Sequence, residues 1–318
     1  MSSLPIATLG VAAFPFIPRY RDAPHNVARI VAALEQASRH GIRLAVFPEA
    51  SISGAGPGTQ QRRAQLDALA EPFDGPSVAT VAQAAERTGV AAGIGWLERG
   101  ADGRLFNSYA VCMPDGRRVR HRQLGPAGRR IAGGTDFTMF DTGWGVQAGI
   151  LVGTDNHASE NVRMTALLGA NLLIAPYRAA HSTPAGRDAS ACELLSRAWP
   201  GRALDNGTFV VFSAGVDDQV AGSQACGAAS IVDPCGRVLA ETGLSPGASE
   251  AFVRANLDLA LARENVGQHW RAARRPALYR GLAEDTAVQA STAPERRPVT
   301  SRGSIALSVA IVRRTPPT

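Results

Sequence analysis

A carboxylate and an imidazole stand out among the side chains that could carry chemistry. Glu49 follows an apolar, strand-like run (residues 42–47) in the segment FPEAS, and His121 lies beside Arg122 in VRHRQL. Carboxylates and imidazoles can be tuned to exchange protons near neutral pH, whereas arginine stays charged. We therefore expect general acid–base chemistry if folding brings Glu49 and His121 into one cleft.

A third polar segment, GTDNH (residues 153–157), follows an apolar run that ends at Val152. It contributes Thr154, Asp155 and His157 as further candidate pocket residues. With the carboxylate and imidazole above, these side chains contain metal-capable atoms, but their spacing matches no metal motif. We expect neither a metal ion nor a cofactor.

The elements that must position these groups alternate along the chain. Apolar periodicity and turn signals predict helices over residues 26–40, 74–89 and 159–168 and one that ends near Asn206. They predict strands over residues 6–14, 42–47, 90–97, 106–113, 119–124, 137–141, 146–152, 172–176, 208–214, 229–232 and 238–241. Mixed hairpins and helix crossovers in one continuous pattern predict a single layered α/β domain.

FPEAS and GILVGTDNHASENVR (residues 149–163) lead a series of segments that runs in order along residues 5–280. FPEAS resembles the first catalytic segment of the nitrilase superfamily of carbon-nitrogen hydrolases, and residues 149–163 resemble that family's Gly-Val-x-Ile-Cys-Tyr-Asp-x-Arg-x-Pro-Glu-x-x-Arg elbow. Four further segments match: GANLLIAPYR (169–178), RALDNGTFVV (202–211), SIVDPCGRVLAE (230–241) and RRPALY (274–279). The resemblance implies a four-layer α-β-β-α sandwich that often dimerises.

The same resemblance implies an active site with a glutamate base, a lysine and a cysteine nucleophile. In that trio the carboxylate takes the thiol proton, the thiolate attacks a carbonyl or nitrile carbon, and the ammonium and a backbone N–H stabilise the developing charge. Glu49 matches the base. The matches of Asp155, Glu160 and Arg163 to the elbow place the nucleophile position at Gly153, which has no side chain to attack with. Thr154 is the nearest hydroxyl, but a shift by one residue would break all three matches.

The lysine position falls on His121, or on Arg122 if the register slips by one residue. The chain contains no lysine, because all 33 basic residues are arginines. The family's second glutamate has no counterpart in residues 124–134. Neither replacement is conservative, since arginine offers a broad, permanently charged fork and imidazole can give or take a proton.

Two functions from different classes follow. The first is an atypical enzyme that uses Glu49 and His121 for non-covalent acid–base work on a small amide- or carbonyl-type substrate, by hydrolysis, cyclisation or elimination. The second is a catalytically inactive scaffold or ligand-binding protein, in which Glu49 is an inherited carboxylate. Gly153 is either decay of a dead site, as the second function implies, or an opening that admits water or a larger substrate. Cys226, in the loop before a predicted strand, is a reserve nucleophile, whereas Cys192 belongs to a helical core.

The composition indicates which classes of partner the protein binds and in which cellular compartment it resides. Nine arginines and three acids from residue 265 onward account for the whole net charge of +6, and no aromatic interleaving accompanies them. We therefore expect no nucleic-acid partner. No window approaches eighteen uncharged apolar residues, so we expect no membrane partner. The N-terminal residues lack a basic region and a cleavage site, and the four cysteines lack a CxxC spacing, which favours a cytoplasmic protein with reduced thiols.

The composition changes beyond about Gly281. We assign residues 1–281 to the carbon-nitrogen hydrolase-like domain and residues 282–318 to an Arg-, Pro- and Ser-rich linker with a C-terminal strand, SIALSVAIV (304–312). That strand either adds to the edge of its own subunit or exchanges across a dimer. We expect a homodimer or higher homo-oligomer that binds a small molecule.

Overall fold

The computed structural model describes residues 7–54, 63–126, 129–178, 187–215, 228–242 and 252–282 of the chain. The chain divides into two compact units, residues 1–274 and residues 275–318. The described part of the second unit is the 3-10 helix η2 (Pro276–Leu282). The linker and C-terminal strand expected over residues 282–318 lie almost wholly outside the described residues.

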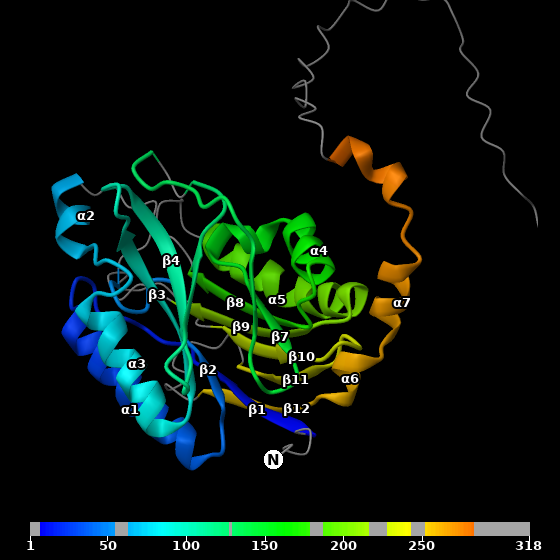
Figure 1. Cartoon of the computed structure of the whole chain (residues 1–318), viewed down its shortest axis with the longest axis horizontal. Helices are drawn as coiled ribbons and strands as arrows, with labels where there is room; N and C mark the ends of the chain where they lie inside the picture. The colour runs from blue at the N-terminus through cyan, green and yellow to red at the C-terminus, as the bar shows by residue number, and fades with distance from the viewer. Residues whose placement is uncertain are drawn as a thin grey trace, which may run out of the picture. The chain divides into compact units, whose positions relative to one another are not determined.

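The first unit is built on two six-stranded sheets (Figure 1). In spatial order, sheet A consists of β12 (Val253–Asp258), β1 (Thr8–Ala13), β2 (Leu44–Val46), β3 (Ala91–Arg99), β4 (Leu105–Cys112) and β5 (Arg118–Arg122). Sheet B consists of β11 (Val238–Glu241), β10 (Ala229–Val232), β9 (Phe209–Gly215), β8 (Leu172–Arg178), β7 (Gln147–Ile150) and β6 (Thr138–Asp141). Parallel pairs occupy the centre of each sheet and antiparallel pairs the edges.

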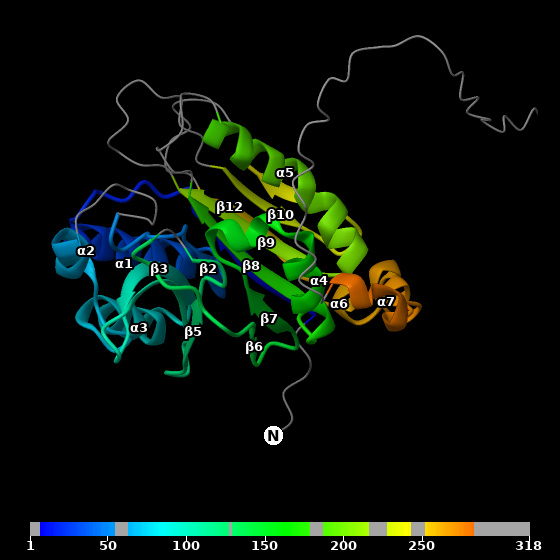
Figure 2. The same ribbon diagram turned by 90° about the horizontal axis from the view of Figure 1, so that it is seen from above.

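Helices cover the outer face of each sheet. On sheet A lie α1 (Ala23–Arg39) and α3 (Pro76–Thr88), with the short α2 (Arg63–Leu69) beside β3; on sheet B lie α4 (Ser159–Leu167) and α5 (Arg187–Asn206). Figure 2 shows α1 and α3 on one side of the paired sheets and α5 on the other. The chain then adds α6 (Ala260–Arg263) and α7 (Val266–Ala272) after β12.

Three apolar layers hold the sandwich together. Strand side chains such as Val11, Val111, Ile150 and Ile174 fill the space between the sheets. Outside them, one cluster joins α1 and α3 to sheet A, and another joins α5 to sheet B. A strand turns alternate residues to opposite faces, so each central strand must be apolar on both faces to serve two layers. The predicted four-layer α-β-β-α sandwich is confirmed.

The position and the start of helix α1 can be explained from its sequence. Its apolar positions Val27, Ile30 and Leu34 recur at helical spacing and are buried against the sheet. The carboxylate of Asp22 accepts a hydrogen bond from the backbone N–H of His25, which satisfies one of the unpaired donors at the first turn. The predicted helix over residues 26–40 is thereby confirmed, with its start three residues earlier.

Candidate active site

Glu49 lies in a tight loop that begins where β2 ends. The loop is pinned to β3: the backbone N–H of Ile52 donates to the carbonyl of Gly95, and the backbone N–H of Gly95 donates to the hydroxyl of Ser51. Ala50, directly after Glu49, has a φ of 54°, a conformation that costs a non-glycine residue about 1–2 kcal/mol. The surrounding contacts therefore hold Glu49 in one backbone position.

Gly95 allows this close approach of loop and strand, and its replacement should displace Glu49. A Cβ on Gly95 would lie 2.4 Å from the backbone nitrogen of Ala50 and 3.0 Å from Cα of Glu49. We expect Gly95→Ala to lower the free energy of unfolding by about 1–3 kcal/mol, because backbone must move to admit the methyl group. Urea titration measures this loss; Gly125→Ala, where a Cβ would meet nothing within 4 Å, is the matched control. Equal stability of the two variants would contradict the expectation.

The Glu49 side chain is buried, and three groups surround its carboxyl. The side-chain amide of Asn107, on β4, donates to Oε1 at 2.7 Å. Arg178, at the carboxyl end of β8, contributes a backbone N–H bond and the positive charge of its guanidinium. Gly153 lies against the carboxyl on the third side. Residues from both sheets thus converge on Glu49.

These surroundings raise the pKa of Glu49 from its ordinary 4.5 to about 7. Burial is the largest cause, because it penalises the charged form. The Arg178 charge and the Asn107 hydrogen bond oppose the rise, and the nearby Asp155 charge adds to it. A carboxyl with this pKa is present in both protonation states at neutral pH, as a general acid–base group requires.

Gly153 begins the 3-10 helix η1 (Gly153–His157), directly after β7. Its φ is 56°, in the left-handed region that favours glycine, and a Cβ there would lie 2.8 Å from Oε2 of Glu49. The Glu49 carboxyl therefore lies in the direction that a side chain at 153 would take. Whether Gly153 reflects decay of a dead site or an opening for water or a larger substrate stays a prediction. Glu49 follows β2 of sheet A and Gly153 follows β7 of sheet B, so their contact joins the two sheets.

A chain of side-chain amides links Glu49 to Thr154. Asn107 Nδ2 also donates to Oε1 of Gln123 at 2.6 Å, and Nε2 of Gln123 donates to the hydroxyl of Thr154. Both hydrogens of the Asn107 amide are thus used, which fixes the orientation of both amides. Thr154 is exposed and accepts the last of these bonds, so its own hydroxyl hydrogen can point toward a ligand.

His121 turns inward from β5 but bonds to groups other than Glu49. Its Nδ1 is 3.1 Å from the hydroxyl of Thr138, and its Nε2 is 3.4 Å from Oδ2 of Asp155. The ring is buried. The structure therefore does not pair His121 with Glu49; Asp155 is the group that faces both.

Asp155 also ties the strand end to the elbow. Its carboxylate accepts hydrogen bonds from the backbone N–H groups of Leu124 (3.0 Å) and Gly125 (3.3 Å) just after β5. Farther along the segment, Arg163 donates to the backbone carbonyl of Asp205 on α5. Both residues hold segments together.

Arg122 is excluded from this site. Successive strand residues face opposite sides of a sheet, so Arg122 points away from the side that His121 takes. Its guanidinium bonds to Glu98 at 2.6 and 3.0 Å on the outer face of sheet A. The alternative register with Arg122 at the lysine position is therefore wrong.

Two candidate residues remain, His157 and Cys226. His157 is exposed, with its ring 5.6 Å from that of Tyr177. Cys226 lies outside the described residues.

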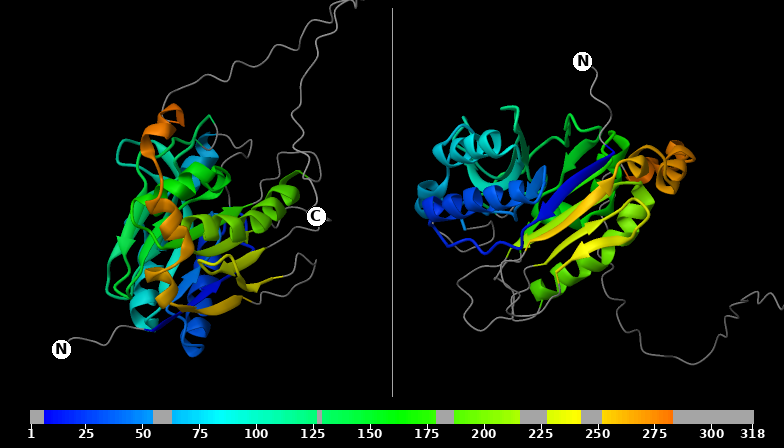
Figure 3. Two further views of the ribbon diagram at one scale, coloured as in Figure 1. Left: turned by 90° about the vertical axis from the view of Figure 1, so that its right-hand side faces the viewer. Right: turned by 90° about the horizontal axis from the view of Figure 1, so that it is seen from below.

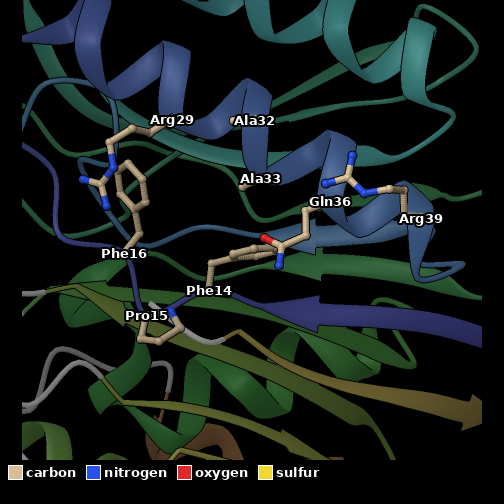
Figure 4. Close-up of a pocket in the computed structure, with 8 residues that line it drawn as sticks. All are labelled: Phe14, Pro15, Phe16, Arg29, Ala32, Ala33, Gln36 and Arg39. Carbon is tan, nitrogen blue, oxygen red and sulfur yellow. The ribbon is translucent and has the colours of Figure 1, made fainter. Parts of the chain in front are cut away.

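Outside the Glu49 region, a second pocket among the described residues adds no catalytic group, and those residues form neither a metal site nor a membrane-spanning helix. A groove of about 360 Å³ between α1 and the segment after β1 is lined by Phe14, Phe16, Gln36 and two arginines, and it contains no acid or thiol (Figure 4). Over the residues that the structure describes, no group of three or more histidine, cysteine or acidic side chains could hold a metal ion. Within the same residues, no helix has the length and apolar character needed to cross a bilayer.

Three site residues were not anticipated from the sequence: Asn107, Gln123 and Arg178. Each of them stands in a sequence context that could have identified it. Asn107 interrupts an otherwise apolar buried strand, Gln123 shares a strand face with His121, and Arg178 ends the apolar run of β8. A polar residue in such a position needs a buried partner, and here the partners are one another and Glu49.

Comparison with known proteins agrees with the family resemblance found in the sequence. The carbon-nitrogen hydrolase family model matches residues 7–264. A Pseudomonas protegens protein described as "hydrolase in pqqF 5′ region" is 30% identical over 292 residues, covering 88% of this chain and 93% of its own. An (R)-stereoselective amidase of a Pseudomonas species is 32% identical over 70% of this chain and 76% of its own. An omega-amidase of Bos taurus is 28% identical over 74% and 83%, respectively.

Among solved structures, a point mutant of the Nesterenkonia AN1 amidase from the nitrilase superfamily superposes with a TM-score of 0.67. It is 23% identical and the match covers 88% of this chain and all of that one. The layered fold, the order of its segments and these relatives agree: the chain belongs to the carbon-nitrogen hydrolase family of the nitrilase superfamily.

Proposed function

We propose that this protein hydrolyses a small amide without a covalent intermediate, with Glu49 as the acid–base group. The observation that carries the proposal is the buried Glu49 carboxyl beside Gly153, with a pKa of about 7. The amidase activity of two relatives supports an amide as the substrate class. Gly153 and the absence of lysine from the sequence support a route without a thioester.

In this mechanism Glu49 takes a proton from a water molecule as the water oxygen attacks the amide carbon. The resulting oxyanion is stabilised by the Arg178 guanidinium and the backbone N–H of Thr154, in the role that an ammonium and an N–H have in the family. Glu49 then returns the proton to the nitrogen, the C–N bond breaks, and an amine and a carboxylic acid leave.

His121 takes a different part from the one expected of an acid partner. Since its Nε2 faces Asp155, whose charge raises the pKa of Glu49, His121 acts on Glu49 through Asp155. It is therefore a positioning residue in this proposal. General acid–base catalysis contributes roughly 10²- to 10⁴-fold, so the substrate must be a fairly reactive amide.

The test is turnover of a panel of small aliphatic amides by the wild type and by Glu49→Gln. We expect a loss of about 10²- to 10⁴-fold in kcat/KM in the variant, and a wild-type kcat/KM that rises with pH through about 7. Glu71→Gln, which alters a carboxyl bonded to Ser77 outside the site, should retain activity. Intact-mass measurement during turnover should detect no acyl adduct. Full activity in Glu49→Gln, or a covalent adduct, would refute the proposal.

A second candidate, a ligand-binding protein without turnover, is favoured by one observation. The Glu49 carboxyl stands where a nucleophile's side chain would be, so the arrangement is not that of a covalent amidase. Thermal-shift screening with the same amides separates the two candidates: stabilisation without product formation supports this one.

A further inference from the structure

Three arginines gather on the outer face of sheet A, away from Glu49. They line a cavity of about 170 Å³ together with Phe106, Gly134 and Thr138. Arg104 precedes β4, while Arg120 and Arg122 lie two residues apart on β5. Because strand residues two apart share a face, Arg120 and Arg122 point into the same space.

A buried carboxylate orients two of these side chains. Glu98 on β3 is 1% exposed and accepts hydrogen bonds from Arg120 at 2.8 Å and from Arg122 at 2.6 and 3.0 Å. Burial would raise the pKa of Glu98, but these bonds and charges, with a bond from Ser108, hold it below the ordinary value. Glu98, Arg120 and Arg122 together therefore carry a net charge of +1, whereas the charge of Arg104 is balanced by Asp102, 2.5 Å from its Nε.

An aromatic ring lies beside two of the guanidiniums, and the backbone at Arg122 is closely packed. Arg122 lies 3.7 Å from the centre of the Phe106 ring, and Arg104 lies 5.3 Å from it. Gly134 passes so close to β5 that a Cβ would lie 2.6 Å from the carbonyl oxygen of Arg122. The Arg122 side chain, 26% exposed, is therefore held more firmly than that of Arg104, which is 65% exposed. A side chain that is already held loses little conformational freedom when a ligand binds.

Donors remain for a ligand. Among the described residues, Arg120 uses Nη1 alone, and Arg104 uses its backbone N–H and Nε on Asp102. Nε and Nη2 of Arg120, Nη1 of Arg122 and both terminal nitrogens of Arg104 have no hydrogen-bond acceptor there. Guanidinium forks of this kind match the paired oxygens of carboxylates and phosphates.

We propose that this cavity is a binding site for a small oxyanion, a carboxylate or phosphate group, held by Arg104, Arg120 and Arg122. The site adjoins the candidate active site without sharing its acid–base groups: β5 turns His121 to the inner face and Arg120 and Arg122 to the outer face, and Thr138, which lines the cavity, also contacts His121. Asp136 is exposed at the cavity wall and opposes an anion there. Its charge limits the affinity.

The experiment titrates the full-length protein with inorganic phosphate and, separately, with acetate, by calorimetry at constant ionic strength, with chloride as the reference anion. We expect saturable binding of at least one oxyanion in the millimolar range, and the tighter of the two identifies the group that the site prefers. Arg120→Gln should weaken this binding about tenfold or more. Arg120 is suited to the test because Glu98 keeps both bonds from Arg122.

Two further variants test whether the anion binds in this cavity and not elsewhere on the protein. Arg118→Gln removes the same charge from the same strand but does not line the cavity, so it should weaken binding much less than Arg120→Gln, which also removes hydrogen-bond donors to the anion. Asp136→Asn should tighten binding several-fold because it removes the opposing charge. No saturable binding of either oxyanion, or equal weakening by Arg118→Gln and Arg120→Gln, would overturn the proposal.

Discussion

Glu49→Gln is expected to remove a pH dependence of about 3 kcal/mol from the stability of the protein. The unfolded chain releases the Glu49 proton near the ordinary pKa of 4.5, whereas the folded protein holds it until about pH 7. Between these values the folded state binds one more proton, so the free energy of unfolding falls by about 1.4 kcal/mol per pH unit. The stabilisation is complete below pH 4.5 and is lost as the pH rises through about 7.

Urea unfolding of wild type and variant at a series of pH values measures this effect. The difference between the two proteins cancels the titration of groups that they share. Relative to the wild type, Glu49→Gln should become about 3 kcal/mol more stable on going from pH 4.5 to about pH 8. Parallel stability curves over that window would mean that Glu49 titrates as it does in the unfolded chain.

Gly153→Ala is expected to lower the free energy of unfolding by about 2–4 kcal/mol. About 1–2 kcal/mol comes from placing a side chain at a φ of 56°. The rest comes from the contact between the new Cβ and Oε2 of Glu49, which would be 2.8 Å apart unless the carboxyl moves. Thermal or urea unfolding gives the total.

Gly41→Ala separates the two causes. Its φ is 69° and a Cβ there would meet nothing within 4 Å, so it reports the backbone cost alone. Combining Gly153→Ala with Glu49→Ala should recover the remainder, because the colliding carboxyl is gone, and a double-mutant cycle measures this coupling. Additive effects would show that residues 49 and 153 do not touch.

Most of the first unit's fold could be predicted from sequence periodicity. The central strands are apolar on both faces and short, and the helices that cover them repeat at helical spacing, so β2, β8 and α1 were found close to their true bounds. The strand β12 was not predicted. Its sequence VRANLD alternates apolar and polar residues, and it pairs in antiparallel register with β1 over six residues (Figure 3). Alternation of this kind is typical of a half-buried strand, so the signal was present in the sequence and was overlooked.

The candidate site was predictable only in part. Glu49 and Gly153 could be placed together because the resemblance to the nitrilase superfamily assigns both positions to one active site. The partner of His121 could not, because strand alternation gives the face of a side chain but not the neighbour that it meets across the sheets. Arg178 was missed because the expected cation was sought in the lysine segment, whereas the positive charge nearest to the base comes from the opposite sheet.

The proposed function requires the carboxyl beside Gly153 to exchange its proton near neutral pH. The most direct measurement is a carbon NMR titration of protein labelled at the glutamate side-chain carboxyl carbons, with the Glu49 signal assigned by its loss in Glu49→Gln. The account predicts a midpoint of about 7 for that signal. A midpoint near the ordinary value of 4.5 would contradict it.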